Sequence, residues 1–343
     1  MRKKILITGG TGYIGSHTCV ELIEDGFEPV IIDNLYNSTA DVVNNIHKIT
    51  GFKPHLEVLD LCEKEKLDKF IGVNSDISAV IHFAAYKAVG ESVNKPLDYY
   101  RNNLLSLVNL LEVMKKYNIP NIVFSSSCTV YGQPEKLPVT EDAPLQPATS
   151  PYGATKQIGE QIIKDTTVSD KNVKAIALRY FNPIGAHPTA LIGELPRGVP
   201  ENLVPYITQT GYGLRDYLKV YGDDYDTPDG SCLRDYLHVV DLAKAHLLAI
   251  KRLVAGKNKT SFEVFNLGTG NAVSVLEAIK SFEHVSGVKL NYKIVGRRIG
   301  DIEKIWADPT FANRELGWKT LSSLDEAMKT AWDWEKKMRT NKE

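Results

Sequence analysis

Short runs of apolar, mostly β-branched residues recur through the first half of the chain, and helix-like stretches separate them. The six runs are residues 5–7, 30–32, 56–58, 80–83, 122–124 and 175–178. Continuous rather than alternating apolarity is typical of strands buried on both faces of a parallel sheet. Strands that alternate with helices in this way predict a doubly wound, Rossmann-like α/β fold with right-handed crossovers.

The composition of the sequence changes from about residue 183, where glycine and proline become frequent. We therefore expect residues 1–182 to form one domain, and residues 183–343 to form a smaller, loop-rich domain of mixed α/β structure. Residues 237–253 have a helical pattern and residues 262–265 resemble a strand, so a segment near residues 235–267 is expected to return to the first sheet. Near the C-terminus, apolar residues follow the spacing of an amphipathic helix that packs on a core: Leu324, Ala327, Met328, Ala331 and Trp332.

The stretch from residue 97 to residue 116 carries apolar residues on more than one face of its predicted helix. A helix that is apolar most of the way round needs more than one packing partner. Two arrangements satisfy this requirement: deep burial within one chain, or burial between two copies of the chain. The working expectation is a homodimer, and a stable monomer in light scattering would contradict it.

The overall composition narrows the class of protein. Apolar residues make up 43% and charged residues 24% of the chain, which is ordinary for a globular enzyme and too apolar for a disordered protein. The 41 basic and 42 acidic residues leave a net charge of −1, which argues against a broad nucleic-acid interface. The four cysteines form no C-x-x-C pair, so no metal site is expected. Because no apolar run has the length of a membrane span or of a signal-peptide core, a cytoplasmic protein is expected.

A glycine-rich loop directly follows the first predicted strand and opens a helix. Its glycines are Gly9, Gly12 and Gly15, in the pattern G-x-x-G-x-x-G. Glycines let the backbone turn and approach a pyrophosphate, whose charge is met by the free N–H groups and the dipole of the helix N-terminus. Asp33 stands 18 residues beyond Gly15, at the end of the second predicted strand, where a carboxylate binds the ribose hydroxyls of a dinucleotide.

The residues around Asp33 indicate which dinucleotide fits. A carboxylate repels the 2′-phosphate of NADP, and the neighbouring Asn34 and Leu35 supply no arginine to bind one, so NAD is favoured. Asp60 and Leu61 close the third predicted strand, where contacts with adenine are expected. Alternatively, Asp60 caps the helix that follows.

Tyr152 and Lys156 form a Tyr-x-x-x-Lys pair. Ser150 and Pro151 are a favourable N-cap and first helical residue, so a helix should begin here with Tyr152 and Lys156 as neighbours on one face. A free phenol has a pKa of about 10, and a nearby ammonium, a cationic nicotinamide ring and the helix N-terminus would each stabilise its phenolate. Tyr152 would then serve as a general base that removes a proton from an alcohol while hydride leaves the carbon.

Residues 125–127 are serines that follow the fifth predicted strand, at the end of the sheet where open α/β proteins bind ligands. Ser127 is the one expected to hydrogen-bond the reacting oxygen. A Tyr-x-x-x-Lys spacing alone is common on surface helices, and a serine-rich turn alone need carry no chemistry. Behind a dinucleotide loop, the two together predict a hydride-transfer site with Ser127, Tyr152 and Lys156 as its catalytic residues.

This ordered set of glycines, Ser127, Tyr152 and Lys156 resembles the extended short-chain dehydrogenase/reductases. Within that family, four further segments are most similar to the enzymes that invert C4 of UDP-glucose: residues 13–18, 87–93, 179–188 and 234–239. The resemblance implies a reversible interconversion of UDP-glucose and UDP-galactose. Tyr152 would take the 4-hydroxyl proton, the C4 hydride would pass to tightly held NAD, and the 4-keto sugar would turn over before the hydride returns.

The resemblance also implies roles for individual residues. Lys156 would lower the pKa of Tyr152 and bind the nicotinamide ribose, and Ser127 would hydrogen-bond the 4-oxygen. The other residues that it assigns to NAD are Tyr13, Ile14, Phe83, Ala84, Lys87, Asn102 and Tyr180. Those that it assigns to the UDP-hexose are Asn182, Asn202, Leu203, Lys219, Tyr221, Arg234, Arg298, Asp301 and Ile305. The first domain would thus hold NAD and the second the UDP-sugar.

Two of these residues make independent sense, because guanidinium groups bind a diphosphate well. Arg234 and Arg298 lie in the second half of the chain, away from the glycine loop that would serve NAD. The alternative is that Arg297 and Arg298 are an ordinary solvated pair.

The sequence departs from the family pattern at Ile305, where members strict for unacetylated sugars tend to carry tyrosine and smaller residues accompany tolerance of a 2-N-acetyl group. Acceptance of UDP-N-acetylhexosamines is therefore one open alternative. A nucleotide-sugar 4,6-dehydratase is a second, although elimination needs an acid and a base, and this chain has Cys128 and Thr129 where that family carries an Asp-Glu pair. An NAD-sensing regulator is a third, and it would have no reason to keep the three catalytic residues together.

Overall fold

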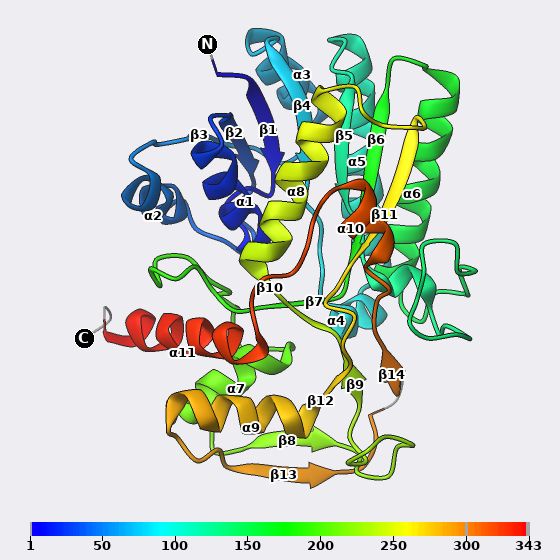
Figure 1. The fold of residues 1–343 in the computed structure, drawn as a ribbon. Coiled ribbons are helices and arrows are strands. Elements are labelled where there is room, and N and C mark those ends of the chain that lie inside the picture. Colours follow the sequence, from blue (N-terminus) through cyan, green and yellow to red (C-terminus); the bar gives the residue numbers. More distant parts are fainter. Residues whose placement is uncertain (1, 299–300, 341–343) are drawn as a thin grey trace.

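The main sheet consists of seven parallel strands in the order β11-β6-β5-β4-β1-β2-β3 (Figure 1). Their bounds are β1 (Lys4–Thr8), β2 (Glu28–Asp33), β3 (His55–Val58), β4 (Ile77–His82), β5 (Asn121–Ser125), β6 (Lys174–Tyr180) and β11 (Phe262–Leu267). The strand order changes direction between β1 and β4, which is the kind of switch point where open α/β sheets bind ligands. The predicted doubly wound fold is confirmed, and the predicted strand at residues 262–265 is its edge strand β11. The structure is a computed structural model that describes residues 2–298 and 301–340.

Helices cover both faces of this sheet. One face carries α1 (Tyr13–Glu24), α2 (Asp41–Thr50) and α8 (Val239–Val254), and the other carries α3 (Lys64–Val73), α5 (Pro96–Lys116) and α6 (Pro151–Ser169). An apolar cluster fills each layer between helices and sheet. Leu6, Val80 and Val123 at the centres of their strands have no exposed surface. Burial from both sides explains why the strand sequences are continuously apolar.

A second group of elements lies below the main sheet in Figure 1. The longer ones are α7 (Leu203–Gly211), β8 (Leu218–Tyr221), α9 (Val275–Ser286), β13 (Tyr292–Val295) and α11 (Leu324–Thr340). The shorter ones in the chain are α4 (Val89–Asn94), the 3₁₀ helix η1 (Cys128–Tyr131), β7 (Asn182–Ile184), β9 (Leu233–Arg234), β10 (Tyr236–His238), β12 (Val273–Ser274), β14 (Lys304–Ile305) and α10 (Thr310–Glu315). A third apolar cluster packs α7, α9 and α11 against β7, β8 and β10, and the predicted apolar face of the C-terminal helix lies in it.

The helix expected at residues 237–253 begins two residues later than predicted, at Val239. Leu237 and His238 belong instead to β10, which pairs with β7. His238 then caps the helix, because its Nδ1 accepts a hydrogen bond from the backbone N–H of Val240 at 3.0 Å. The strand pairing and the cap together decide where α8 starts, and neither is visible in the hydrophobic spacing.

Helix α5 buries one side within the chain and leaves apolar residues on another. Its side chains of Leu107, Leu110 and Val113 are buried in the core, whereas Leu97 and Leu105 are 72% and 41% exposed. The apolar excess noted in the sequence is therefore only partly used inside one chain. Neither α5 nor any other helix of the described residues combines the length and the apolarity needed to cross a membrane.

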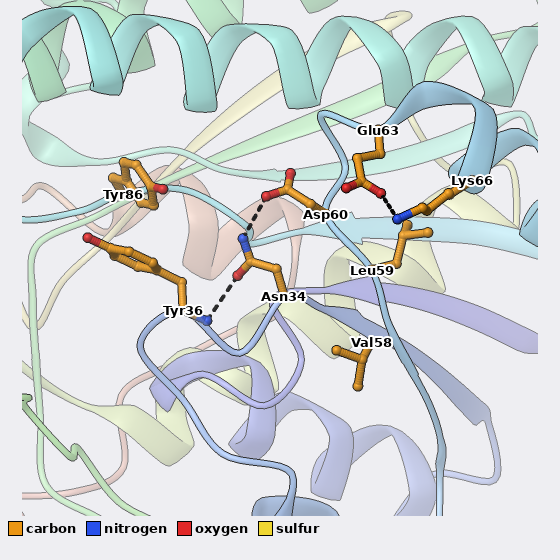
Figure 2. Close-up of a pocket in the computed structure, with 8 residues that line it drawn as sticks. All are labelled: Asn34, Tyr36, Val58, Leu59, Asp60, Glu63, Lys66 and Tyr86. Carbon is orange, nitrogen blue, oxygen red and sulfur yellow. Dashed lines mark hydrogen bonds and ion pairs between the residues drawn. The ribbon is translucent and has the colours of Figure 1, made fainter.

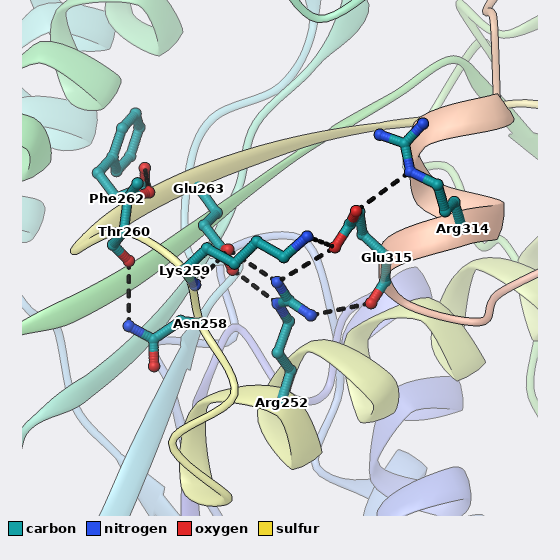
Figure 3. A network of polar contacts seen from close by, with 8 residues as sticks. All are labelled: Arg252, Asn258, Lys259, Thr260, Phe262, Glu263, Arg314 and Glu315. Atoms are coloured by element: carbon teal, nitrogen blue, oxygen red, sulfur yellow. Dashed lines mark hydrogen bonds and ion pairs between the residues drawn. The ribbon is translucent and has the colours of Figure 1, made fainter.

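A network of charged residues fixes the edge strand β11 to the helices beside it (Figure 3). Arg252 of α8 lies between two carboxylates and donates to Glu263 of β11 from Nε at 2.7 Å and from Nη2 at 2.8 Å. Its Nη1 donates to the backbone carbonyl of Glu315 at 2.9 Å, and Lys259 pairs with the Glu315 carboxylate at 2.7 Å. The network ties the returning strand, α8 and α10 together.

Candidate active site

The glycine loop forms a tight turn between β1 and α1 with no room for side chains. Gly9 has a φ of +73°, and a Cβ there would lie 2.8 Å from the backbone nitrogen of Ala84. A Cβ at Gly15 would collide with the carbonyl oxygen of Gly9. Gly12 is the N-cap of α1 and no side chain caps this helix, so the backbone N–H groups of its first turn are left for another acceptor beside this cradle of glycines. These features fit a pyrophosphate.

Asp33 lies at the end of β2 with its carboxylate buried and held by three donors. Its Oδ2 accepts from the backbone N–H of Thr11 at 3.1 Å, and its Oδ1 accepts from the backbone N–H of Leu35 at 2.9 Å and from Ser38 Oγ at 3.1 Å. These bonds link the glycine loop to the loop after β2. The carboxylate is therefore fixed beside the glycine cradle, as the sequence predicts.

A pocket of about 370 Å³ opens beside the ends of β2 and β3 (Figure 2). Asn34 donates from Nδ2 to Asp60 Oδ2 at 3.0 Å across the pocket and accepts from the backbone N–H of Tyr36 at 3.1 Å. Asp60 does not cap α3, whose N-cap is Glu63. Leu61 is buried in the core and does not line the pocket, so only its backbone can face a ligand there.

The segment after β4 closes the other side of the glycine cradle. The backbone N–H groups of Phe83 and Ala84 both donate to the carbonyl of Thr8, at 2.9 and 3.1 Å. Farther along, Lys87 pairs with Glu194 at 2.8 Å. Asn102 donates from Nδ2 to Asn103 Oδ1 at 2.9 Å.

Asn103 is a residue that sequence reasoning missed. It is buried, and its side chain both accepts from the N–H of Tyr86 at 2.8 Å and donates to the carbonyl of Tyr86 at 3.0 Å. It also donates to Thr155 Oγ1 at 3.1 Å, one residue before Lys156. Asn103 therefore ties the segment after β4 to helix α6. Its only sequence signal is an amide among the apolar residues of α5.

Helix α6 begins as predicted, with the side chain of Ser150 accepting from the backbone N–H of Gly153 at 3.1 Å and Pro151 in the first turn. Tyr152 and Lys156 are 8% and 4% exposed. The Lys156 ammonium donates to the carbonyl of Ser125 at 2.6 Å, and lies 5.8 Å from the centre of the Tyr152 ring. The i, i+4 spacing thus brings both residues to the carboxyl end of β5.

Ser127 lies at the same place, with 6% of its surface exposed. It is the N-cap of η1, and its hydroxyl accepts from the backbone N–H of Thr129 at 3.2 Å. Nearby, the Tyr180 hydroxyl hydrogen-bonds Ser125 Oγ at 2.6 Å. Four predicted residues, Ser127, Tyr152, Lys156 and Tyr180, therefore surround the ends of β5 and β6.

Burial dominates the acid–base properties of this cluster. It raises the pKa of Tyr152 well above the usual value of a phenol, and the hydrogen bond from Ser127 opposes that shift. It lowers the pKa of Lys156 to about 8. With this raised pKa, Tyr152 is a neutral phenol at pH 7. Stabilisation of its phenolate needs a cationic ligand in addition to Lys156.

A buried ion pair supports the cluster from below and was also missed. Glu160, one turn beyond Lys156 on α6, accepts from Arg179 Nε at 2.9 Å and from Arg179 Nη2 at 2.6 Å. Ser126 Oγ donates to the same carboxylate at 2.5 Å, and Arg179 Nη1 donates to the Tyr131 hydroxyl at 3.0 Å. The pair fixes the segment 125–131 on which Ser127 sits. The sequence did contain one signal for Glu160: it follows Lys156 at the same four-residue spacing that separates Lys156 from Tyr152.

The residues assigned to a UDP-hexose lie on short strands and loops. Asn182 donates to the backbone carbonyl of Asp235 at 3.0 Å, and Asn202, the N-cap of α7, donates to Glu194 at 2.7 Å. Leu203 is the first residue of α7, and Lys219 and Tyr221 lie in β8. Lys219 is exposed.

Arg234 and Arg298 have different surroundings. Arg234 Nη1 donates to the carbonyl of Leu233 at 2.9 Å, and its charge acts on Cys128, beside Ser127, where burial raises the thiol pKa to about 12 and the guanidinium opposes the shift. Arg298 pairs with Asp301 at 2.7 Å and lies 5.1 Å from the centre of the Tyr221 ring. Arg234 therefore lies near enough to Cys128 for its charge to be felt there, and Arg298 lies beside β8.

Two further positions complete this side. Asp235 was missed: it has no exposed surface and accepts from the N–H groups of Thr269, Gly270 and Ala307 at 2.8–3.2 Å. Its carboxylate thus holds the backbone at residues 269, 270 and 307, while its own carbonyl accepts from Asn182. Ile305 is 3% exposed and packs in an apolar cluster that includes Tyr131 and Phe181.

Residues 5–268 match the model of the NAD dependent epimerase/dehydratase family. The chain belongs to this family. It is 50% identical to a UDP-glucose 4-epimerase of Bacillus subtilis over 331 residues, 96% of each chain, and 46% identical to the human UDP-glucose 4-epimerase over 342 residues, 98% of this chain and 97% of that one.

Solved structures agree with this family assignment. A UDP-glucose 4-epimerase from Bifidobacterium longum in complex with NAD⁺ and UDP matches with a TM-score of 0.93 and 45% identity, covering 97% of this chain and 98% of that one. A UDP-glucose 4-epimerase from Stenotrophomonas maltophila with bound NAD and formylated UDP-arabinopyranose matches with a TM-score of 0.95 and 44% identity, covering 99% and 100%. The region that matches the epimerase/dehydratase family runs from the second residue of β1 to one residue beyond β11, so it covers the main sheet except for Lys4.

Proposed function

We propose that this protein interconverts UDP-glucose and UDP-galactose by inverting C4 of the hexose, with NAD as its cofactor. The observation that carries the proposal is the cluster of Ser127, Tyr152 and Lys156, buried at the ends of β5 and β6 beside a glycine loop fit for a pyrophosphate. The identity of 50% to a UDP-glucose 4-epimerase over nearly the whole chain supports the same reaction.

NAD would be held mainly by the first half of the chain. The backbone at Gly9, Gly12, Tyr13, Ile14 and Gly15 would face the pyrophosphate, and Asp33 the adenosine ribose. The pocket of Figure 2, with Asn34 and Asp60 and the backbone of Leu61 next to it, would take the adenine. The remaining contacts would come from Phe83, Ala84, Lys87, Asn102, Tyr152, Lys156 and Tyr180.

The side chains of the cluster divide the proton chemistry between them. NAD, when bound, would accept the C4 hydride and return it. Tyr152 would remove the proton of the sugar 4-hydroxyl as a general base and give it back as a general acid. Ser127 would hydrogen-bond the 4-oxygen, and the Lys156 ammonium would stabilise the phenolate of Tyr152. Burial of all three keeps water away from the oxidised sugar.

The UDP-hexose would lie against the shorter elements of the second half. Arg234 and Arg298 would bind the diphosphate, with Arg298 exchanging its partner Asp301 for phosphate oxygens. Asn182, Asn202, Leu203, Lys219, Tyr221, Asp301 and Ile305 would provide the other contacts. In this proposal residues 1–182, with the returning segment near residues 235–267, serve NAD, and residues 183–343 serve the substrate.

The direct test is to incubate purified protein with UDP-galactose and no added NAD, and to separate the products by anion-exchange chromatography. We expect UDP-glucose to form. Absence of conversion, also after NAD is supplied, would refute the proposal. A 4,6-dehydratase would instead yield a 4-keto-6-deoxy sugar, which the same separation detects.

The same assay with UDP-N-acetylglucosamine addresses the alternative raised by Ile305. Its side chain is buried in an apolar cluster, so the size of the space beside it depends on how that cluster packs. Formation of UDP-N-acetylgalactosamine would broaden the proposed substrate class, and no product would restrict it to unacetylated hexoses.

We propose further that the protein is a cytoplasmic homodimer. Support for the dimer comes from apolar side chains that lie exposed on three neighbouring helices: Val89 and Val93 of α4, Leu97 and Leu105 of α5, and Ile158 of α6. Support for the compartment comes from four free cysteines, which are typical of a reducing environment. Light scattering of the purified protein tests the first, and a stable monomer would contradict it.

A further inference from the structure

The segment of residues 186–198, which we name the strap, leaves β7 and reaches back to the main sheet. Its Arg197 makes three hydrogen bonds to the loop between β2 and α2. Nη1 donates to the carbonyl of Tyr36 at 2.6 Å, and Nη2 donates to the carbonyls of Leu35 at 3.2 Å and Ser38 at 2.8 Å. One guanidinium therefore fixes three carbonyls of a loop about 160 residues away in sequence.

This loop carries two of the groups that hold Asp33. The backbone N–H of Leu35 and the hydroxyl of Ser38 both bind Asp33 Oδ1, and the Ser38 hydroxyl also contacts Thr11 Oγ1 at 2.7 Å. A displacement of the loop would remove donors from Asp33 and a neighbour from the glycine loop. Arg197 thus acts on the ribose-binding carboxylate through Leu35 and Ser38.

The loop is held in a conformation that it would not favour alone. Leu35 has a φ of +57°, a left-handed conformation that is unfavourable for a residue with a Cβ. Tyr36 has half of its surface exposed and packs on Tyr86, with 4.7 Å between ring centres. Both tyrosines line the pocket of Figure 2. A strained, half-exposed loop that forms a pocket wall needs an external contact to stay in place.

We propose that Arg197 is a positioning residue for the cofactor: it holds the loop of residues 34–38 against Asp33 and the pocket, and thereby slows the release of NAD. The inference rests on the proposed function, since it takes NAD as the occupant of the glycine loop and the pocket. In this inference, a residue from the second half of the chain helps to retain NAD, whose other contacts come from the first half.

The strap has anchors of its own, so removing the guanidinium should leave it in place. Glu194 Oε1 accepts from Lys87 at 2.8 Å and from Asn202 at 2.7 Å, and its backbone carbonyl accepts from Trp334 Nε1 at 2.9 Å. Arg215 provides a matched control: its Nη2 donates to Gly198 on the strap at 3.4 Å, but its contacts do not involve the loop after β2.

The experiment compares Arg197→Ala, Arg197→Lys and Arg215→Ala with the wild type. Each protein is loaded with radiolabelled NAD, chased with unlabelled NAD, and filtered at intervals to give the dissociation rate. We expect Arg197→Ala to release NAD about tenfold faster, equivalent to ~1.4 kcal/mol. Arg197→Lys should recover part of the difference, because an ammonium can still donate to one or two of the carbonyls. Arg215→Ala should match the wild type.

A second readout needs no cofactor. In the NAD-free proteins, hydrogen exchange of the backbone amides in residues 34–40 should be faster in Arg197→Ala than in the wild type, while residues 186–195 of the strap should exchange alike. A dissociation rate in Arg197→Ala equal to that of the wild type would overturn the inference, as would equal acceleration in Arg215→Ala. If the wild type holds NAD and epimerises UDP-galactose, and the variants release NAD at the wild-type rate, only the role of Arg197 is refuted. A wild-type protein that binds no NAD refutes the proposed function with it.

Discussion

Lys156 and Arg298 are both cations of the proposed site, and the protein surrounds them very differently. Lys156 is 4% exposed on a helix of 19 residues, and its ammonium donates to a backbone carbonyl. The Arg298 side chain is 56% exposed on the segment between β13 and β14, and it pairs with Asp301 three residues away. One cation is fixed by the core, and the other lies at the surface, where it pairs with a carboxylate that is only 12% exposed.

The difference teaches how binding and chemistry are separated. Burying an ammonium is unfavourable, and the lowered pKa of Lys156 reflects that cost. In return the ammonium is held in one place by burial and by its hydrogen bond to Ser125, which suits a group that must stabilise charge during the reaction. The Arg298 side chain is more than half exposed, so we expect a diphosphate to reach its guanidinium and to replace Asp301 as its partner. Chemistry is assigned to the rigid region and capture to the adaptable one.

The largest effect is expected where the buried cluster loses its proton carrier. Tyr152→Phe keeps the ring in the core and removes only the hydroxyl, so the fold and the NAD content should stay as in the wild type. We expect turnover of UDP-galactose to fall by about 10² or more, the scale of a lost general acid/base. Product formation by chromatography and NAD content by absorbance of the denatured protein are the measurements.

Tyr292→Phe, in the half-exposed strand β13, is the matched control for the same chemical change. It should leave turnover within about twofold of the wild type, as surface substitutions usually do. If Tyr152→Phe and Tyr292→Phe were equally active, Tyr152 would have no part in the proposed mechanism. The buried cluster would then no longer differ from the exposed region in its role.

The buried region was also the part that the sequence could predict. Continuous apolar runs located the strands, and fixed local spacings located the glycine loop and the Tyr152–Lys156 pair. The sequence did not predict contacts between residues that lie far apart along the chain. Glu160 and Arg179, for example, meet only because α6 packs on β6. Arg197 meets its carbonyls only because the strap folds back.

The acid–base state of the cluster was equally hidden. Sequence reasoning expected the pKa of Tyr152 to be lowered, whereas burial raises it. The sign of the net effect depends on desolvation, which follows from tertiary packing and not from the spacing of Tyr152 and Lys156. The positive nicotinamide ring of NAD would also change the pKa of Tyr152. The local sequence does not reveal how large that effect is compared with the effect of burial.

A smaller effect is expected from the charge of Lys156. Its pKa of about 8 means that the ammonium is present below pH 8 and lost as the pH rises through that value, so turnover should decline on the alkaline side. Lys156→Met should lower turnover about ten- to a hundredfold, because a nearby cation shifts a pKa by a unit or more and each unit is worth about a factor of ten. The variant should also lack the alkaline decline. Rates from about pH 6 to about pH 10 provide the measurement.

Stability should change with pH in the opposite sense. The folded-state pKa of Lys156 lies below its ordinary value of 10.5, so between the two values the unfolded chain binds more protons and stability from this group rises with pH. Urea midpoints of the wild type should therefore rise relative to Lys156→Met from about pH 8 to about pH 10.5. A constant difference across this range would contradict burial of a charged Lys156.

The smallest effect is expected in the exposed region, where two adjacent arginines allow a direct comparison. Arg297 pairs with Asp224 and lies 4.1 Å from the centre of the Tyr225 ring, whereas Arg298 pairs with Asp301 beside Tyr221. Arg298→Ala should raise the KM for UDP-galactose about tenfold, because a hydrogen bond to a charged group is worth about 1.5–3 kcal/mol and solvent screens part of it. Arg297→Ala should leave KM within about twofold. Raising the salt from about 0.05 M to about 0.5 M should bring the KM values of the wild type and Arg298→Ala closer together, because only the exposed cation is screened. Equal KM values for Arg297→Ala and Arg298→Ala would place the diphosphate elsewhere.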